Sequence, residues 1–119
     1  MNIELSAAPV FAAAMKTAAS NAANSYFIEH YQGVDQGACG FAWVNIIPQH
    51  KGNTKLGKAE RKVYRAMGFE LDYTGKTFMM WNPSQLGCQN VDVKEAGARA
   101  AAEVLSDAGV EAYAASRLD

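Results

Sequence analysis

The sequence predicts an α+β fold: a ferredoxin-like split βαβ arrangement (βαββαβ, sheet order 4-1-3-2) preceded by an N-terminal helix. Hydrophobic periodicity gives the order strand, helix, strand, strand, helix, strand after a leading helix. The two strands that this sheet order places in the centre are also the two that are apolar on both faces. The length of 119 residues suits one domain. We therefore expect a single domain over residues 1–119, with a leading helix within 1–33 and the βαββαβ core over 39–119.

The leading helix is predicted from about Ala7 to Tyr31, where apolar residues recur at spacings of three and four. Ser6 can cap its start, and Gly33 can end it. Polar residues occupy another side of this helix, so it should lie on the surface of the domain. It could cover the face of the sheet that the other two helices leave bare.

The first strand and the second helix of the series follow from local composition. The segment Phe41–Ile47 is bulky, β-branched and bounded by glycine and proline, which predicts a strand. A helix is predicted over Lys55–Met67 and ends at Gly68. The side of this helix that should be buried carries Leu56, Ala59, Val63 and Met67.

Two further strands are expected on either side of a turn at Gly75. Over Phe69–Thr74, apolar and polar residues alternate, which is typical of a strand with one wet face. The segment Thr77–Trp81 is apolar on both faces and is stopped by an Asn-Pro-Ser sequence.

The last helix and strand complete the series. Asp92, followed three residues later by Glu95, forms an acidic variant of the capping box and opens a helix that runs to Ala108. Gly109 ends that helix, and Val110–Ala115 is predicted to be the final strand.

Large side chains must fill the core, because half of the residues are hydrophobic but many of these are alanine. Folding at this length hides roughly two-thirds of the surface of the unfolded chain. The expected core consists of Phe27, Phe41, Trp43, Ile46, Val63, Met67, Phe69, Leu71, Phe78, Met80, Trp81 and Leu105.

Composition excludes several classes of protein. The net charge of −1 predicts no overall attraction to nucleic acid or to a membrane. Two cysteines argue against a disulfide-stapled secreted scaffold. There is no apolar run near twenty residues, and no basic start leads into an apolar stretch, which argues against a membrane span and a signal peptide. We expect a cytoplasmic protein.

Basic side chains are concentrated in the loop and helix from His50 to Arg65. Six of the eleven Lys and Arg residues lie there, against a single acid, Glu60. Helical spacing places four of them in a ridge opposite the apolar stripe, and the start of the helix favours an anion. Lys76 in the hairpin turn should lie beside this loop. The predicted anion-binding or nucleic-acid-binding residues are Lys51, Asn53, Lys55, Lys58, Arg61, Lys62, Arg65 and Lys76. The alternative is a solvated helix face that binds nothing.

The segment Gly52 to Lys58 has the spacing of a phosphate-binding G-x-x-x-x-G-K loop. Ala59 stands where that loop needs a magnesium-binding hydroxyl, and the expected strand order does not suit such a nucleotidase. We therefore reject this interpretation.

Two other sets of residues raise the possibility of base stacking and of a zinc site, but the sequence does not favour either. Trp43 and Phe78 lie where RNA-recognition modules stack bases, but the leading helix should cover that face, so core packing is expected. Cys39 and Cys88 have neither C-x-x-C nor H-x-x-x-H neighbours, so idle thiols are favoured over a zinc site. No catalytic residue, metal or cofactor is predicted.

Four segments resemble small uncharacterised proteins encoded in tailed-phage genomes: Cys39-Gly-Phe-Ala-Trp-Val44, Lys51-Gly-Asn-Thr54, Gly57-Lys-Ala-Glu-Arg61 and Ser116-Arg-Leu-Asp119. The resemblance covers most of the chain from Cys39 onward and transfers no catalytic residue. It implies an accessory phage protein that acts in the cytoplasm of the infected host cell.

These observations favour a non-enzymatic binding protein whose basic loop and helix engage nucleic acid or an acidic protein surface. An inhibitor of a host defence or replication protein is the first alternative. A small enzyme acting on a phosphorylated substrate is the second, and it requires a pocket near Asn53 and Lys58 that contains a titratable group. A homo-oligomer is compatible with the sequence, and a membrane partner is not expected.

Overall fold

The computed structural model of the chain describes residues 3–119. In chain order, its elements are η1 (Leu5–Ala7), α1 (Ala8–Tyr31), β1 (Gly40–Ile46), α2 (Lys55–Ala66), β2 (Glu70–Leu71), β3 (Phe78–Trp81), α3 (Val91–Asp107) and β4 (Ala112–Leu118). The α+β class and the N-terminal helix are confirmed. Among these helices, none is long and apolar enough to cross a membrane.

The four strands form one antiparallel sheet in the order β2-β3-β1-β4. Read from the other edge, the order is β4-β1-β3-β2. Trp43 on β1 pairs with Trp81 on β3 and with Ala115 on β4. The two central strands are β1 and β3, which are the strands with apolar residues on both faces.

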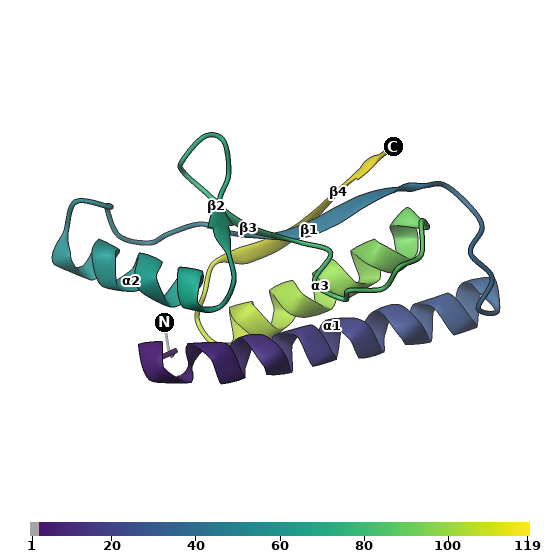
Figure 1. Ribbon diagram of the computed structural model, residues 1–119, viewed down its shortest axis with the longest axis horizontal. Coiled ribbons are helices and arrows are strands. Elements are labelled where there is room, and N and C mark those ends of the chain that lie inside the picture. Colours follow the sequence, from purple (N-terminus) through teal and green to yellow (C-terminus); the bar gives the residue numbers. More distant parts are fainter. Residues whose placement is uncertain (1–2) are drawn as a thin grey trace.

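Helices α1 and α3 lie in two layers on one side of the sheet, whereas α2 lies beside it. Figure 1 shows α3 beneath the sheet and α1 beneath α3. The expectation that the leading helix could cover the other sheet face is therefore wrong.

Small residues explain why α1 packs on α3. A Cβ atom at Gly97 would lie 2.7 Å from the Cβ of Ser84 and 3.2 Å from the carbonyl oxygen of Ala19, so α3 approaches its neighbours closely there. The buried positions of α1 are Ala8, Ala12, Met15, Ala19 and Ala23, four alanines and one methionine. Such a stripe fits a helix surface made of glycine and alanine better than a sheet of large side chains.

The core lies between the sheet and the helices. Fully buried large side chains include Tyr64, Phe69, Phe78, Met15 and Leu105. Three residues predicted for the core are exposed instead: Phe41 at 37%, Leu71 at 40% and Trp81 at 50%. Two others, Phe27 and Trp43, are only partly buried. Phe41 and Trp81 lie on the sheet face that no helix covers, which is the physical reason for the difference.

Some predicted element ends were wrong. Ser6 lies in η1, and Ala7, which precedes α1, makes no capping side-chain hydrogen bond. The cap of α3 is Asn90 and not Asp92, because the Asn90 side-chain oxygen accepts hydrogen bonds from the amides of Asp92 and Val93. The strand expected to reach Thr74 is only two residues long, since the Asp72 carboxylate accepts from the Thr74 amide and hydroxyl and forms a turn.

Candidate binding pocket beside helix α2

Helix α2 begins in a tight turn that its own sequence dictates. The Thr54 hydroxyl accepts a hydrogen bond from the Gly57 amide at 3.0 Å and donates one to the Lys51 carbonyl at 2.7 Å. A Cβ atom at Gly57 would lie 1.8 Å from that same Lys51 carbonyl oxygen. Gly57 is therefore required for close backbone packing, and the resemblance to a phosphate-binding loop has this local explanation.

Glu60 holds the loop that precedes α2. Its side chain is 4% exposed, and it accepts hydrogen bonds from the amides of Gln49 (2.8 Å) and His50 (3.0 Å) and from the Tyr64 hydroxyl (2.5 Å). Burial by itself raises the pKa of Glu60, but these three hydrogen bonds outweigh it and hold the pKa below its usual range. The carboxylate stays charged at neutral pH and is a poor general base.

Two of the predicted basic residues serve the fold. The Arg61 guanidinium donates to the carbonyls of His50 (2.8 Å) and Gly57 (3.0 Å), which ties the loop to the helix. The Arg65 guanidinium lies 5.3 Å from the ring centroid of Phe78, a buried core residue. Arg61 is therefore less available to a ligand than the sequence indicates, whereas Arg65 remains exposed beside Phe78.

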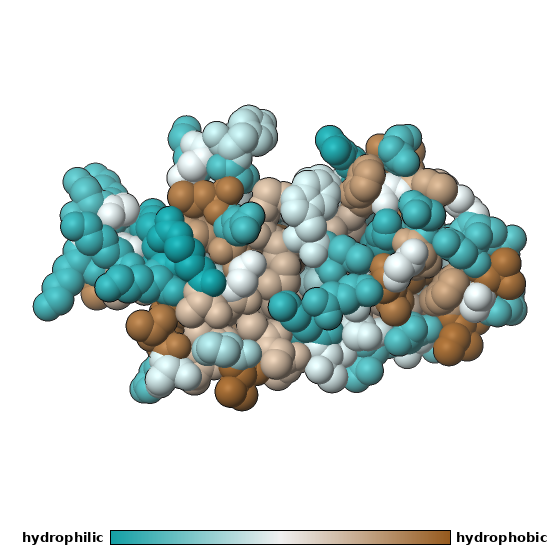
Figure 2. Space-filling view, viewed as in Figure 1, coloured by the Kyte–Doolittle hydropathy of each residue, from teal (hydrophilic) through white to brown (hydrophobic). Residues whose placement is uncertain are grey.

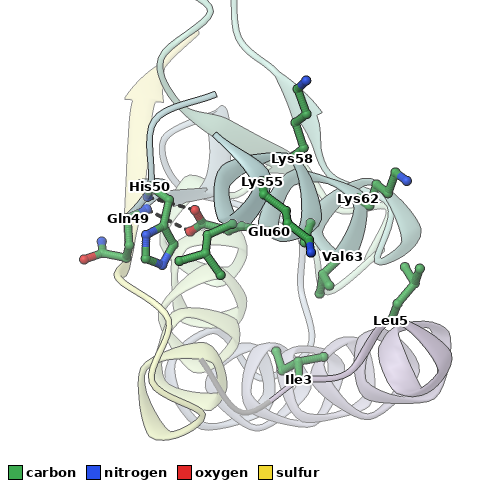
Figure 3. Close-up of a pocket in the computed structure, with 11 residues that line it drawn as sticks. Ile3, Leu5, Gln49, His50, Lys55, Lys58, Glu60, Lys62 and Val63 are labelled. Atoms are coloured by element: carbon green, nitrogen blue, oxygen red, sulfur yellow. Dashed lines mark hydrogen bonds between the residues drawn. The ribbon is translucent and has the colours of Figure 1, made fainter. Parts of the chain in front are cut away.

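A pocket of about 740 Å³ opens between α2 and the segment before α1. Its floor consists of Ile3, Leu5, Leu56, Ala59 and Val63. Lys55, Lys58 and Lys62 form the lysine rim, and Gln49, His50 and Glu60 complete the lining. Figure 3 shows Ile3 and Leu5 across the pocket from α2, while Lys58 and Lys62 extend outward from the helix.

The apolar side of α2 is only partly buried, which corrects the predicted stripe. Val63 and Met67 are buried, but Leu56 is 65% exposed and Ala59 is exposed. Helix α2 lies beside the sheet and not across it (Figure 1), so its first turns have no sheet beneath them. The uncovered residues supply the floor of the pocket.

The lysine rim carries unpaired charge. Within residues 3–119 the single ion pair joins Arg99 to Glu95, far along the chain from α2. Hydrophilic side chains gather over the α2 end of the molecule in Figure 2. The pocket therefore joins an apolar floor to an uncompensated positive rim.

The remaining predicted site residues lie outside the pocket. Lys51 and Asn53 are exposed in the loop before α2. Lys76 is exposed in the turn between β2 and β3, which projects from the sheet on the side away from the helices (Figure 1). The structure thus brings Lys55, Lys58 and Lys62 together around one cavity.

The chain matches no protein-family model. No curated protein and no solved structure is significantly similar to it either. The site must therefore be interpreted from its own geometry.

The thiols lie away from the pocket. The backbone of Cys39 forms an isolated antiparallel β-bridge with that of Asn90, which places Cys39 near the segment that contains Cys88. Both thiols are free, and burial raises the pKa of Cys88, so this thiol is protonated at neutral pH. In the described part of the chain, no three His, Cys, Asp or Glu side chains are arranged to hold a metal ion.

Sequence reasoning missed the contribution of Ile3 and Leu5 to the pocket, the exposure of Leu56 and Ala59, and the role of Glu60. Ile3 and Leu5 precede the predicted leading helix, so no periodic pattern included them. Glu60 had a usable signal, because it is the single acid among six basic residues and lies on the side of α2 that also carries Gly57 and Tyr64. A lone acid at such a position indicates an internal hydrogen-bonding role.

Proposed function

We propose that the chain is a ferredoxin-like binding protein, without enzymatic activity, whose α2 pocket holds an acidic protein segment. The apolar floor would take aliphatic or aromatic side chains of that segment, and the lysine rim would contact carboxylates beside them. The observation that carries the proposal is the combination of that floor with three lysines that have no ion-pair partner among residues 3–119.

An acidic protein segment fits this surface better than nucleic acid does. A phosphate backbone gains from an extended cationic surface and does not use an aliphatic floor. Arg61 is already engaged in hydrogen bonds within the fold. The resemblance to small tailed-phage proteins supports a host-cell protein as the partner. Inhibition of a host defence or replication protein is one consequence that such binding could have.

The geometry gives less support to an enzyme acting on a phosphorylated substrate. A pocket with titratable groups does exist near Lys58, since His50 and Glu60 line it. However, the Glu60 carboxylate is occupied by three hydrogen bonds, and its lowered pKa makes it a weak base. Its role is to hold the loop in place.

The proposal is tested by fluorescence anisotropy with two labelled probes: an amphipathic peptide of Glu and Leu at helical spacing, and single-stranded or double-stranded DNA. The peptide should bind the wild-type protein, with an affinity that falls as salt rises. Leu56→Ser removes an exposed floor residue, and the double variant Lys58→Glu, Lys62→Glu reverses two rim charges. Each variant should weaken peptide binding by about tenfold.

Lys76→Glu is the matched control, because Lys76 was predicted for the same site but lies outside the pocket. It should leave peptide binding unchanged. DNA binding that survives Leu56→Ser and is lost in Lys76→Glu would support the nucleic-acid alternative. Failure of the peptide to bind the wild-type protein would refute the pocket as an acidic-segment site.

A further inference from the structure

The sheet face opposite the helices is uncovered in the described chain (Figure 1). Side chains alternate along each strand, so register assigns to this face Phe41, Trp43, Asn45, Met79, Trp81, Tyr113, Ala115 and Arg117. Phe78 and Met80 point the other way and are buried in the core. The Trp43–Phe78 pair considered for base stacking is therefore split between the two faces of the sheet.

The uncovered face carries a connected group of aromatic side chains. Trp43 and Trp81 have ring centroids 4.8 Å apart, and Phe41 meets Trp81 edge-on at 6.1 Å. Trp81 is 50% exposed and Tyr113 is 46% exposed. Aromatic and methionine side chains are enriched in the centres of protein interfaces, and a connected apolar patch of this kind marks an interaction site.

The two ends of this face carry opposite charges. Arg117 lies beside Phe41 at one end, with its guanidinium 5.4 Å from the ring centroid. Glu111 lies beside Ile47 at the other end, where the Ile47 amide donates to the Glu111 carbonyl. Glu111 directly precedes β4, and continued alternation places both charged residues on the uncovered face. The Glu111 carboxylate also accepts a hydrogen bond from the Gln49 side chain at 2.5 Å. Glu111 lies three residues before Ala114, and Arg117 lies three residues after it. The two opposite charges are therefore placed symmetrically about Ala114.

We infer that this face binds a second copy of the chain. In the proposed dimer, the uncovered faces of the two sheets stack on each other. The two-fold axis lies between the sheets, runs perpendicular to the strands and passes over Ala114. Each β4 then lies over β4 of the second copy and runs in the opposite direction. Arg117 would then meet Glu111 of the second copy, and the contact would occur twice, as in any isologous interface. The same rotation sets Tyr113 over Ala115, so a large side chain meets a small one.

The hairpin turn between β2 and β3 fits the same arrangement. This turn projects on the uncovered side of the sheet (Figure 1), and Tyr73 at its tip is fully exposed. It forms one wall of a groove of about 380 Å³ whose floor includes Trp43, Trp81 and Tyr113. Because β2 is only two residues long, it leaves the edge of β3 near Trp81 uncovered. The rotation brings the turn of the second copy to that uncovered edge.

Charge favours a second copy over a nucleic-acid strand. Three acids, Asp72, Glu70 and Glu111, lie in the groove or at its margin. Three cations balance them: Arg117, Lys76 in the adjoining turn, and Lys94, whose ammonium lies 5.6 Å from the Phe41 ring centroid. A polyanion would meet no net positive charge here, whereas a second copy places each Arg117 against an acid.

The size of the face sets the expected strength. The strands contain seven, two, four and seven residues. At roughly 3.3 Å per residue and roughly 4.8 Å between strands, they give a flat area of about 320 Å². A stable interface of standard size buries about 800 Å² on each partner. We therefore expect a reversible dimer that dissociates on dilution. Its residues do not line the α2 pocket, although Glu111 is hydrogen-bonded to Gln49, which does.

Sedimentation velocity over a concentration series tests the dimer. The wild-type chain should pass from monomer to dimer as its concentration rises, and Trp81→Glu should keep it monomeric. Arg117→Glu and Glu111→Arg should each raise the dissociation constant at least tenfold. The double variant, which restores opposite charges across the interface, should recover most of the wild-type affinity.

Val10→Glu is the matched control, because Val10 is 74% exposed and belongs to α1, which α3 separates from the sheet (Figure 1). It should not change the dissociation constant, and circular dichroism should show that every variant is folded. A wild-type chain that stays monomeric at high concentration would overturn the inference. So would a double variant that associates no better than the single ones, or Trp81-dependent binding of single-stranded RNA by a monomer.

Discussion

At the scale of single residues, Glu60 organises the candidate pocket without being a ligand group. It is the one acid in a strongly basic segment, and its carboxylate joins the chain after β1 to the middle of α2. A buried carboxylate is costly unless hydrogen bonds satisfy it. Two backbone amides and the Tyr64 hydroxyl supply those bonds and fix the loop that carries Gln49 and His50 into the pocket lining.

We predict that Glu60→Gln destabilises the fold by about 2 kcal/mol, since hydrogen bonds to a charged group contribute roughly 1.5–3 kcal/mol each. The glutamine amide group would face at least one donor and could not accept its hydrogen bond. Urea unfolding followed by circular dichroism measures the effect. Glu103→Gln is the matched control, because Glu103 is exposed on α3 and its substitution should leave the free energy of unfolding nearly unchanged.

The lowered pKa of Glu60 also predicts how stability depends on pH. The folded state binds fewer protons at Glu60 than the unfolded state does, so this group stabilises the fold above its unfolded pKa. That stabilisation is lost as pH falls through the lower pKa of the folded state. The urea midpoint of the wild-type chain should therefore fall more between about pH 5 and pH 3 than that of Glu60→Gln. An equal fall in both proteins would show that Glu60 is not responsible.

At the scale of elements, the contact between α2 and its preceding loop depends on the absence of a side chain at Gly57. We predict that Gly57→Ala displaces the loop and lowers stability by about 2 kcal/mol or more, because the new Cβ would lie 1.8 Å from a backbone oxygen. The same displacement should weaken binding of the acidic peptide. Chemical denaturation and peptide anisotropy measure the two effects.

Gly52→Ala is the matched control for that substitution. The atoms nearest to its Cβ would belong to the Arg61 side chain, at 3.4 Å, which is ordinary van der Waals contact and involves no backbone atom at that distance. We expect it to change stability by less than about 0.5 kcal/mol. If Gly52→Ala is as damaging as Gly57→Ala, the loop is sensitive to any substitution and the close-approach explanation is wrong.

The helices and strands were predictable because each has a strong local signal. The glycines that end α1, α2 and α3 and the apolar runs of β1 and β3 fixed their approximate ranges. Boundaries failed where side chains had several possible roles: Asn90, not Asp92, caps α3, and Asp72 forms a turn where alternation indicated strand. Local patterns do not show which of two neighbouring polar side chains reaches the backbone.

At the scale of the whole molecule, the position of α1 could not be predicted, and it decides which surfaces are free. An alanine-rich helix has no large side chains that would indicate the sheet as its partner. By packing on α3, it leaves the aromatic face open and places η1 opposite α2, where Ile3 and Leu5 complete the pocket. The lysines were predicted from the sequence, but the apolar floor beside them depended on tertiary packing.

The packing of α1 on α3 gives a test of whether the chain is one cooperative unit. The buried cluster that contains Ala12, Met15 and Ala19 of α1 also contains Val44 and Phe78 of the sheet. We predict that Ala19→Leu, which adds a branched side chain at a fully buried contact, lowers the free energy of unfolding by about 1–3 kcal/mol. Ala13→Leu, on the exposed side of the same helix, should leave it within about 0.5 kcal/mol. Because the cluster is continuous, helix content and tryptophan fluorescence should change in one transition in guanidinium chloride. If the two signals separate in Ala19→Leu, α1 unfolds on its own and is an appendage to the βαββαβ core.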